Sequence, residues 1–97
     1  MTISDDCIIP QSAVIEPGAT IGPRAVLAGD GIVIRSRARL DAACVIDAQV
    51  VVGQGAWVRA GSVVLTSVPP NAIVEGNPAR VIGYRNDTDQ PDLAAPK

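Results

Sequence analysis

Residues 34–64 read IRSRAR LDAACV IDAQVV VGQGAW VRAGSV V, and every six-residue unit opens with an aliphatic residue. After a slip of one residue within positions 28–33, the same spacing continues back towards the N-terminus. An amphipathic helix would place apolar residues three and four apart, and a β-sandwich has no reason to keep one period over so long a stretch. The aliphatic positions are Ile3, Ile9, Ile15, Ile21, Leu27, Ile34, Leu40, Ile46, Val52, Val58 and Val64.

A second set of positions lies four residues after the first, and its side chains are mostly small. These positions are Cys7, Ala13, Ala19, Ala25, Gly31, Ala38, Cys44, Val50, Ala56, Ser62 and Val68. Turn-forming pairs such as Pro17-Gly18 and Gln54-Gly55 fall between the two sets. This pattern predicts an all-β, parallel β-helix of short strands and tight corners, with three units closing one triangular coil and about four coils in all. The extra residue in the segment Gly29-Asp30-Gly31 predicts a bulged corner.

The outward positions sort into faces of different character. One face carries the apolar residues Ile8, Val26, Ala28, Val45, Val63 and Leu65, which we expect to form the interface of a homotrimer. Another face carries Arg39 and Trp57 one coil apart, which predicts a cation–π pair. Asp41 and Arg59 have the same separation and are expected to form an ion pair.

Composition excludes several classes of function. The net charge is −2 without a dense basic run, which disfavours nucleic-acid binding, and no apolar run is long enough to span a membrane. Residues 1–6 lack the features of a signal peptide, so a cytoplasmic location is expected. Cys7 and Cys44 are two coils apart, too far for a disulfide, and are read as core residues. With no histidine in the chain, no metal site is expected. Residues 1–85 are predicted to form the folded domain and residues 86–97 a disordered polar tail.

The C-terminal part of the repeat carries a family resemblance. The segment from Val52 to Val64, followed by Val68-Pro-Pro-Asn71 and Gly76-Asn-Pro-Ala-Arg80, resembles the last coil of the hexapeptide-repeat acyltransferases. That family includes the serine, maltose, galactoside and nucleotide-sugar acetyltransferases. The resemblance implies a left-handed β-helix. This hand comes from the resemblance alone, because parallel crossovers are nearly always right-handed. It also implies a trimer that binds acyl-CoA between neighbouring subunits.

The same resemblance suggests the residues of a donor site. Ala60 and Gly61 would lie beside the pantetheine arm, with Ala42 at the same corner one coil earlier. Their small side chains would leave backbone amide groups accessible. Arg80 would lie near the phosphates of the nucleotide end, and Arg85 would add a second cation.

The chain departs from the family at three points. It has Val64-Leu-Thr-Ser-Val68 where the family usually has Val-Thr-Lys-Asp-Val, and its repeat begins at Ile3, so a preceding substrate-binding region is expected to be absent. The family's general base is a histidine, which this chain lacks. The segment Asp5-Asp6-Cys7-Ile8 loosely resembles the His-Asp-Cys segment of the nucleotide-sugar acetyltransferases. This resemblance puts Asp5 in the place of the histidine and makes it the candidate catalytic residue. Asp6 and Arg24, on the same predicted corner, are candidate acceptor-binding residues. The alternative role of the two aspartates is to keep the end of the helix soluble.

Two functions therefore remain from sequence. One is an acyltransferase that moves an acetyl group from acetyl-CoA, or another acyl-CoA, to a small-molecule acceptor such as a sugar or an amine. The alternative is a catalytically inactive β-helix that serves as a scaffold or as one subunit of a mixed trimer. A carbonic anhydrase of the γ class is excluded because it needs three histidines around zinc.

Overall fold

The computed structural model describes residues 2–3 and 6–85, which form twelve strands and no helix. Asp5 and the whole predicted tail, 86–97, lie outside the described residues. The strands are β1 (Thr2–Ile3), β2 (Val14–Ile15), β3 (Thr20–Ile21), β4 (Val26–Ala28), β5 (Val33–Ile34), β6 (Arg39–Leu40), β7 (Val45–Asp47), β8 (Val51–Val52), β9 (Trp57–Val58), β10 (Val63–Val64), β11 (Ala72–Gly76) and β12 (Ala79–Tyr84). Within this part of the chain nothing forms a helix that could cross a membrane.

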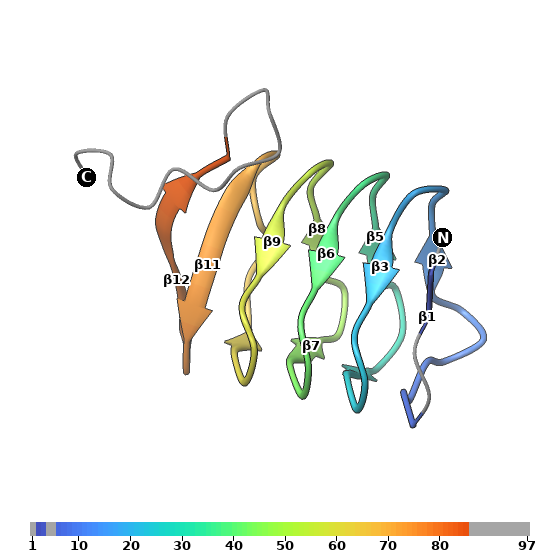
Figure 1. The fold of residues 1–97 in the computed structure, drawn as a ribbon. Helices are drawn as coiled ribbons and strands as arrows, with labels where there is room; N and C mark the ends of the chain where they lie inside the picture. Colours follow the sequence, from blue (N-terminus) through green and yellow to red (C-terminus); the bar gives the residue numbers. More distant parts are fainter. Residues whose placement is uncertain (1, 4–5, 86–97) are drawn as a thin grey trace.

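The strands form three sheets that are the walls of a solenoid (Figure 1). Sheet A has the order β1-β3-β6-β9-β11-β12, sheet B contains β4, β7 and β10, and sheet C contains β2, β5 and β8. Pairing between successive coils is parallel and in register, as in the row Ile21, Leu40 and Val58. The solenoid makes about three turns. They follow a partial first turn in which sheet B is represented only by a bridge between Ile8 and Val26. The predicted all-β parallel fold is confirmed.

The core is the stack of inward side chains at the two predicted sets of positions. The aliphatic positions from Ile21 to Val64 are all buried, because a strand in a closed coil turns alternate side chains inward. Burial fades at the N-terminal end, where Ile3 is 43% exposed and Ile9 and Ile15 are half-buried. The core is therefore closed at the C-terminal end and open at the other.

The extra residue within positions 28–33 has a different effect on register from the predicted one. Gly31 is exposed, and Ile32 is the fully buried residue that takes the inward position assigned to Gly31. Gly29 and Gly31 have φ angles of 148° and 76°, so the bulge uses conformations that favour glycine. The neighbouring coil accommodates the bulge, since the Gln49 amide donates to the Asp30 carbonyl at 2.9 Å. The bulged corner is confirmed, and the assignment of Gly31 to the core is wrong.

The regular ladder ends at Pro69-Pro70. Sheet C stops at a single bridge between Val52 and Val68, because proline has no N–H to continue the ladder. After the prolines, residues 72–76 form β11. Strand β12 then returns antiparallel to β11, with Gly76 opposite Ala79. Residues 76–79 are therefore the turn of a hairpin that closes sheet A.

Candidate functional site

The corner between sheets A and B, here called the AB corner, brings together most of the predicted site residues. Asp6, Arg24, Ala43 and Gly61 occupy equivalent positions in successive coils, with φ angles of 64°, 62°, 60° and 73°. The amides of Ala43 and Gly61 donate to the carbonyls of Pro23 and Ala42 at 2.9 and 3.0 Å. These bonds tie the corners into one column that ends at Gly61. Asp5, which precedes Asp6 in sequence, lies outside the described residues.

Two backbone donors remain unpaired in this column. Within the part of the chain that the structure describes, the N–H groups of Ala42 and Ala60 donate no hydrogen bond, and both residues are exposed. The Gly61 N–H, expected to be accessible, is instead used by the ladder. One coil earlier the equivalent residue is Pro23, which has no N–H. The corner therefore offers two adjacent donors, roughly 4.8 Å apart by the spacing of parallel strands.

Some of the equivalent donors at the other two corners are missing or already bonded. Pro17 and Pro70 have no N–H at the corner between sheets C and A, here called the CA corner. At that corner the Ser36 N–H donates to the Glu16 carboxylate at 2.9 Å. At the corner between sheets B and C, the Ala48 N–H donates to its neighbour Asp47 at 2.8 Å. Gln11 and Asp30, in adjacent coils of that corner, also donate no backbone N–H hydrogen bond within the described residues, so free donors occur at the AB corner without being confined to it.

The C-terminal end of the AB corner is also open. A Cβ atom placed on Gly61 would meet no atom within 4 Å. At the CA corner, by contrast, a Cβ on Gly55 would collide with the Asn71 side-chain oxygen. The last corner of this column is therefore not covered by a further coil.

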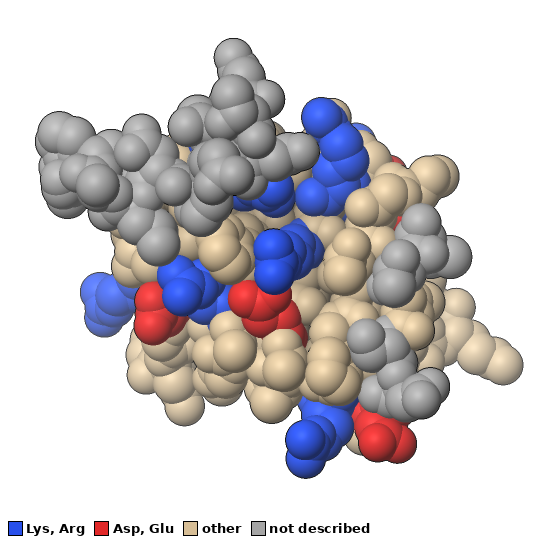
Figure 2. Space-filling view, in the orientation of Figure 1, with Lys and Arg blue, Asp and Glu red and all other residues tan. Residues whose placement is uncertain are grey.

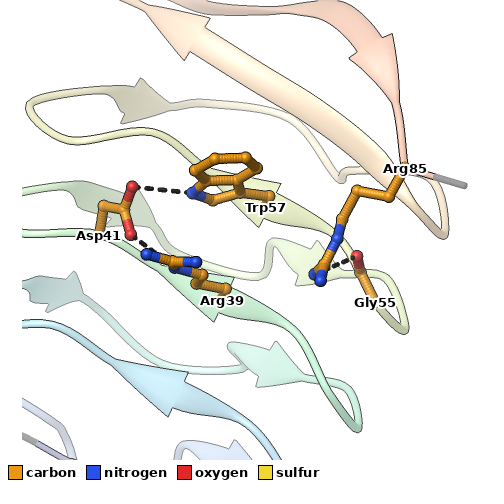
Figure 3. Close-up of polar contacts among 5 residues, drawn as sticks. All are labelled: Arg39, Asp41, Gly55, Trp57 and Arg85. Carbon is orange, nitrogen blue, oxygen red and sulfur yellow. Dashed lines mark hydrogen bonds and ion pairs between the residues drawn. The ribbon is translucent and has the colours of Figure 1, made fainter. Parts of the chain in front are cut away.

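The two predicted phosphate-binding arginines lie at opposite ends of strand β12. Arg80 is exposed and pairs with Glu75 in the β11–β12 hairpin, at the end of these strands nearer the AB corner. Arg85 instead lies at the CA corner. Its backbone N–H donates to the Asn71 carbonyl at 2.7 Å and its guanidinium to the Gly55 carbonyl at 3.1 Å (Figure 3). Of these two arginines, Arg80 is therefore the one on the side of the AB corner.

The outer face of sheet A carries interleaved arginine and acidic side chains (Figure 2). The guanidinium of Arg39 stacks over the Trp57 ring at 4.9 Å, which confirms the predicted cation–π pair. Asp41 accepts from Arg39 Nε at 3.0 Å and from Trp57 Nε1 at 2.7 Å (Figure 3). The predicted pairing of Asp41 with Arg59 is wrong, because Arg59 also stacks on Trp57, at 4.8 Å. Asp41 thus fixes a stacked surface beside the AB corner.

Neither cysteine provides a catalytic or metal-binding group at this surface. Burial raises the pKa of the Cys44 thiol to about 12, so Cys44 stays protonated at neutral pH and is not a nucleophile. The half-buried Cys7 thiol donates to the Gly22 carbonyl at 3.1 Å. Among the described residues, no three histidine, cysteine or acidic side chains cluster as metal ligands.

This solenoid, with its C-terminal hairpin, closely matches known enzymes. The chain is 36% identical over 93 residues to serine acetyltransferase of Escherichia coli (strain K12), a match that spans 89% of this chain. A solved serine acetyltransferase in complex with CoA superposes over 84% of this chain with a TM-score of 0.79 and 29% identity. A hexapeptide-repeat acetyltransferase of Vibrio cholerae, complexed with acetyl-CoA, superposes over 88% with a TM-score of 0.69 and 25% identity.

The chain belongs to the hexapeptide-repeat β-helix acetyltransferase superfamily. Within it, serine acetyltransferases are the relatives that both sequence and structure match. Because superposition preserves handedness, the solenoid has the hand of those structures, as the resemblance implied. The chain spans about a third of the E. coli serine acetyltransferase, with 34% of that enzyme covered, and 60% of the Vibrio cholerae structure. No protein-family model matches the chain.

Proposed function

We propose that this protein binds acyl-CoA along the AB corner and transfers its acyl group, in the simplest case acetyl, to a small-molecule acceptor. The observation that carries the proposal is the pair of free N–H groups at Ala42 and Ala60. A pantetheine arm is an extended chain with amide carbonyls, which are acceptors for such donors. Related structures bound to CoA and to acetyl-CoA support this class of ligand.

The charge of Arg80 suggests the direction in which the acyl-CoA donor lies along the AB corner. Arg80 is an exposed cation beyond the last AB corner, suited to the phosphates of the nucleotide end. The pantetheine arm would then run from Ala60 past Ala42 towards Arg24 and Asp6. From Gly61 to Asp6 the column spans three coil steps, roughly 14 Å. The thioester is therefore expected beside Arg24 and Asp6, where the acceptor would bind.

We therefore assign Arg24 and Asp6 to acceptor binding and Asp5 to proton removal. An alcohol or ammonium group must lose a proton to attack a thioester, and the chain has no histidine to accept it. The acceptor is taken to be serine, as in the names of the matched enzymes, or an amino sugar. The apolar stripe on sheet B supports assembly into a homotrimer.

Removing the Arg80 charge should weaken donor binding. We expect Arg80→Ala to raise the Kd for acetyl-CoA about tenfold in calorimetric titration, because it deletes one charge-assisted contact to phosphate. Arg80→Lys keeps the charge and should lose less. The melting temperature should stay unchanged, since Arg80 is exposed. An absence of acetyl-CoA binding by the wild type up to millimolar concentration would overturn the proposed function.

Asp5→Asn separates chemistry from binding. We expect kcat to fall by about 10²-fold or more, with the affinity for acetyl-CoA retained, because the variant loses only a general base. The measurement is CoA release with serine and amino sugars as acceptors. Unchanged turnover would rule out Asp5 as the base. Donor binding without turnover in the wild type would support the inactive scaffold instead.

A further inference from the structure

Two arginines on the outer side of sheet A have no acidic partner. Arg59 follows β9, and Arg37 lies beside the sheet at the CA corner. Among residues 2–3 and 6–85, neither guanidinium forms an ion pair. Glu75 occupies the position next to Arg59 in the adjoining strand β11, but it is exposed, and Arg59 stacks on Trp57 instead. This side of the molecule therefore carries positive charge that the described carboxylates do not neutralise.

Stacking on the tryptophan holds the Arg59 guanidinium in place. Arg39 and Arg59 both lie over the Trp57 ring, with guanidinium carbons 4.9 and 4.8 Å from its centroid. The ring is held in turn by the hydrogen bond that its indole N–H donates to Asp41 at 2.7 Å. A guanidinium that stacks with its flat face keeps its N–H groups in its own plane, where they can bind a carboxylate through two parallel hydrogen bonds. Arg59 therefore offers a preformed contact for an acidic side chain.

The sequence supplies an acidic segment next to this face. Residues 86–97 carry three aspartates, Asp87, Asp89 and Asp92, and one lysine, whereas all seven arginines precede them. The segment has a single large apolar side chain, Leu93, and two prolines. It is therefore poorly suited to burying apolar surface or to continuing the sheet. Charge is the main interaction that it can offer a folded surface.

The acidic segment starts close to the unpaired arginines. Arg85, the residue before it, donates through its guanidinium to the Gly55 carbonyl at 3.1 Å (Figure 3). Arg59 lies four residues beyond Gly55, or roughly 13 Å along the strand direction. Asp89 and Asp92 follow Arg85 by four and seven residues, which an extended chain spans in up to roughly 13 and 23 Å. The aspartates are therefore within reach of Arg59.

We infer that residues 86–97 lie across the outer face of sheet A, with their aspartates paired to Arg59 and Arg37 and their backbone covering Trp57. Tethering favours this occupant over a free acidic partner, because a segment joined through a few residues is present at a millimolar effective concentration. A second copy of the same face fits less well, since two arginine-bearing surfaces repel each other. The contact neutralises a face that otherwise attracts other anions.

Quenching of tryptophan fluorescence tests the contact, because Trp57 is the only tryptophan in the sequence. In the full chain at low ionic strength, the triple variant Asp87→Asn/Asp89→Asn/Asp92→Asn should raise the Stern–Volmer constant for acrylamide at least about twofold, since a segment held by charge is released when its charge is removed. Sodium chloride at about 0.5 M should raise the wild-type constant to the same level, because it screens exposed ion pairs, and should leave the triple variant unchanged. Acrylamide is neutral, so the constant reports how far the ring is covered and not the attraction of the quencher.

Two further variants make the result specific. Asp30→Asn/Asp47→Asn removes carboxylates at the corner between sheets B and C and should leave the constant unchanged. Arg37 does not stack on Trp57, so Arg37→Gln should raise the constant in the wild type but add nothing in the triple variant, since both changes remove the same contact. A constant that the triple variant or salt leaves unchanged would overturn the inference. So would an equal rise in Asp30→Asn/Asp47→Asn, or an additive effect of Arg37→Gln. No acyl-CoA is present, so the result does not depend on the proposed function.

Discussion

Gly53→Ala is expected to destabilise the solenoid severely. A Cβ atom at position 53 would lie 2.6 Å from the Pro70 nitrogen and 2.7 Å from the Val68 carbonyl oxygen. Both are backbone atoms of the next coil and cannot rotate away as a side chain would. We expect a loss of about 3 kcal/mol, at the upper end of overpacking costs. The melting temperature should fall by more than about 12 °C for a domain of this size, which thermal circular dichroism measures directly.

Gly61→Ala is the matched control at the AB corner. The added methyl group meets nothing within 4 Å, so only the left-handed φ of 73° opposes it. That conformation costs about 1–2 kcal/mol for an alanine. Equal losses in the two variants would show that backbone conformation, and not contact between coils, decides which corners need glycine.

Ala42→Trp should strongly weaken donor binding while leaving the fold intact. Ala42 is exposed, so an indole can be added without entering the core, but it would cover the free N–H groups of Ala42 and Ala60. We expect the Kd for acetyl-CoA to rise by at least about 30-fold, equivalent to losing two hydrogen bonds and their access. Isothermal titration calorimetry measures the change, and light scattering verifies that assembly is retained.

Ala42→Ser provides the control, because it keeps both the small volume and the backbone donor. It should bind acetyl-CoA within a factor of about two of the wild type. Wild-type affinity in Ala42→Trp would place the donor away from the AB corner and contradict the proposed groove.

Sequence periodicity is sufficient to predict the solenoid, because a closed coil allows only one side-chain position in two to point inward. The aliphatic column from Ile21 to Val64 is buried as expected. The exception at Gly31 and Ile32 shows the limit of counting. Because one residue is inserted in this corner, either Gly31 or Ile32 can take the inward position. Spacing alone does not decide between them.

Contacts between side chains of neighbouring coils are less predictable. Two adjacent coils of sheet A each present two neighbouring outward side chains, so each residue has two possible partners. These residues are Arg39, Asp41, Trp57 and Arg59. The indole N–H favours the Asp41 carboxylate, and Arg59 then stacks on the ring. Spacing alone therefore identifies the four residues that lie together but not which of them contact each other.

The free donors and strand β12 depend on details of the backbone. The signal for the donors is present in sequence, since Pro23 is replaced by alanine at positions 42 and 60. It has meaning only once these residues are known to share a corner. Strand β12 has no hexapeptide pattern, because it pairs antiparallel outside the coil, and so the repeat does not predict it.

If acyl-CoA lies along the AB corner, an acetyl-CoA titration of nitrogen-15-labelled protein should change the amide chemical shifts of that corner. We expect the Ala42 and Ala60 resonances to move furthest, with saturable changes at Gly61 and Arg24. No change up to millimolar acetyl-CoA, or changes confined to the stacked surface around Trp57, would contradict it.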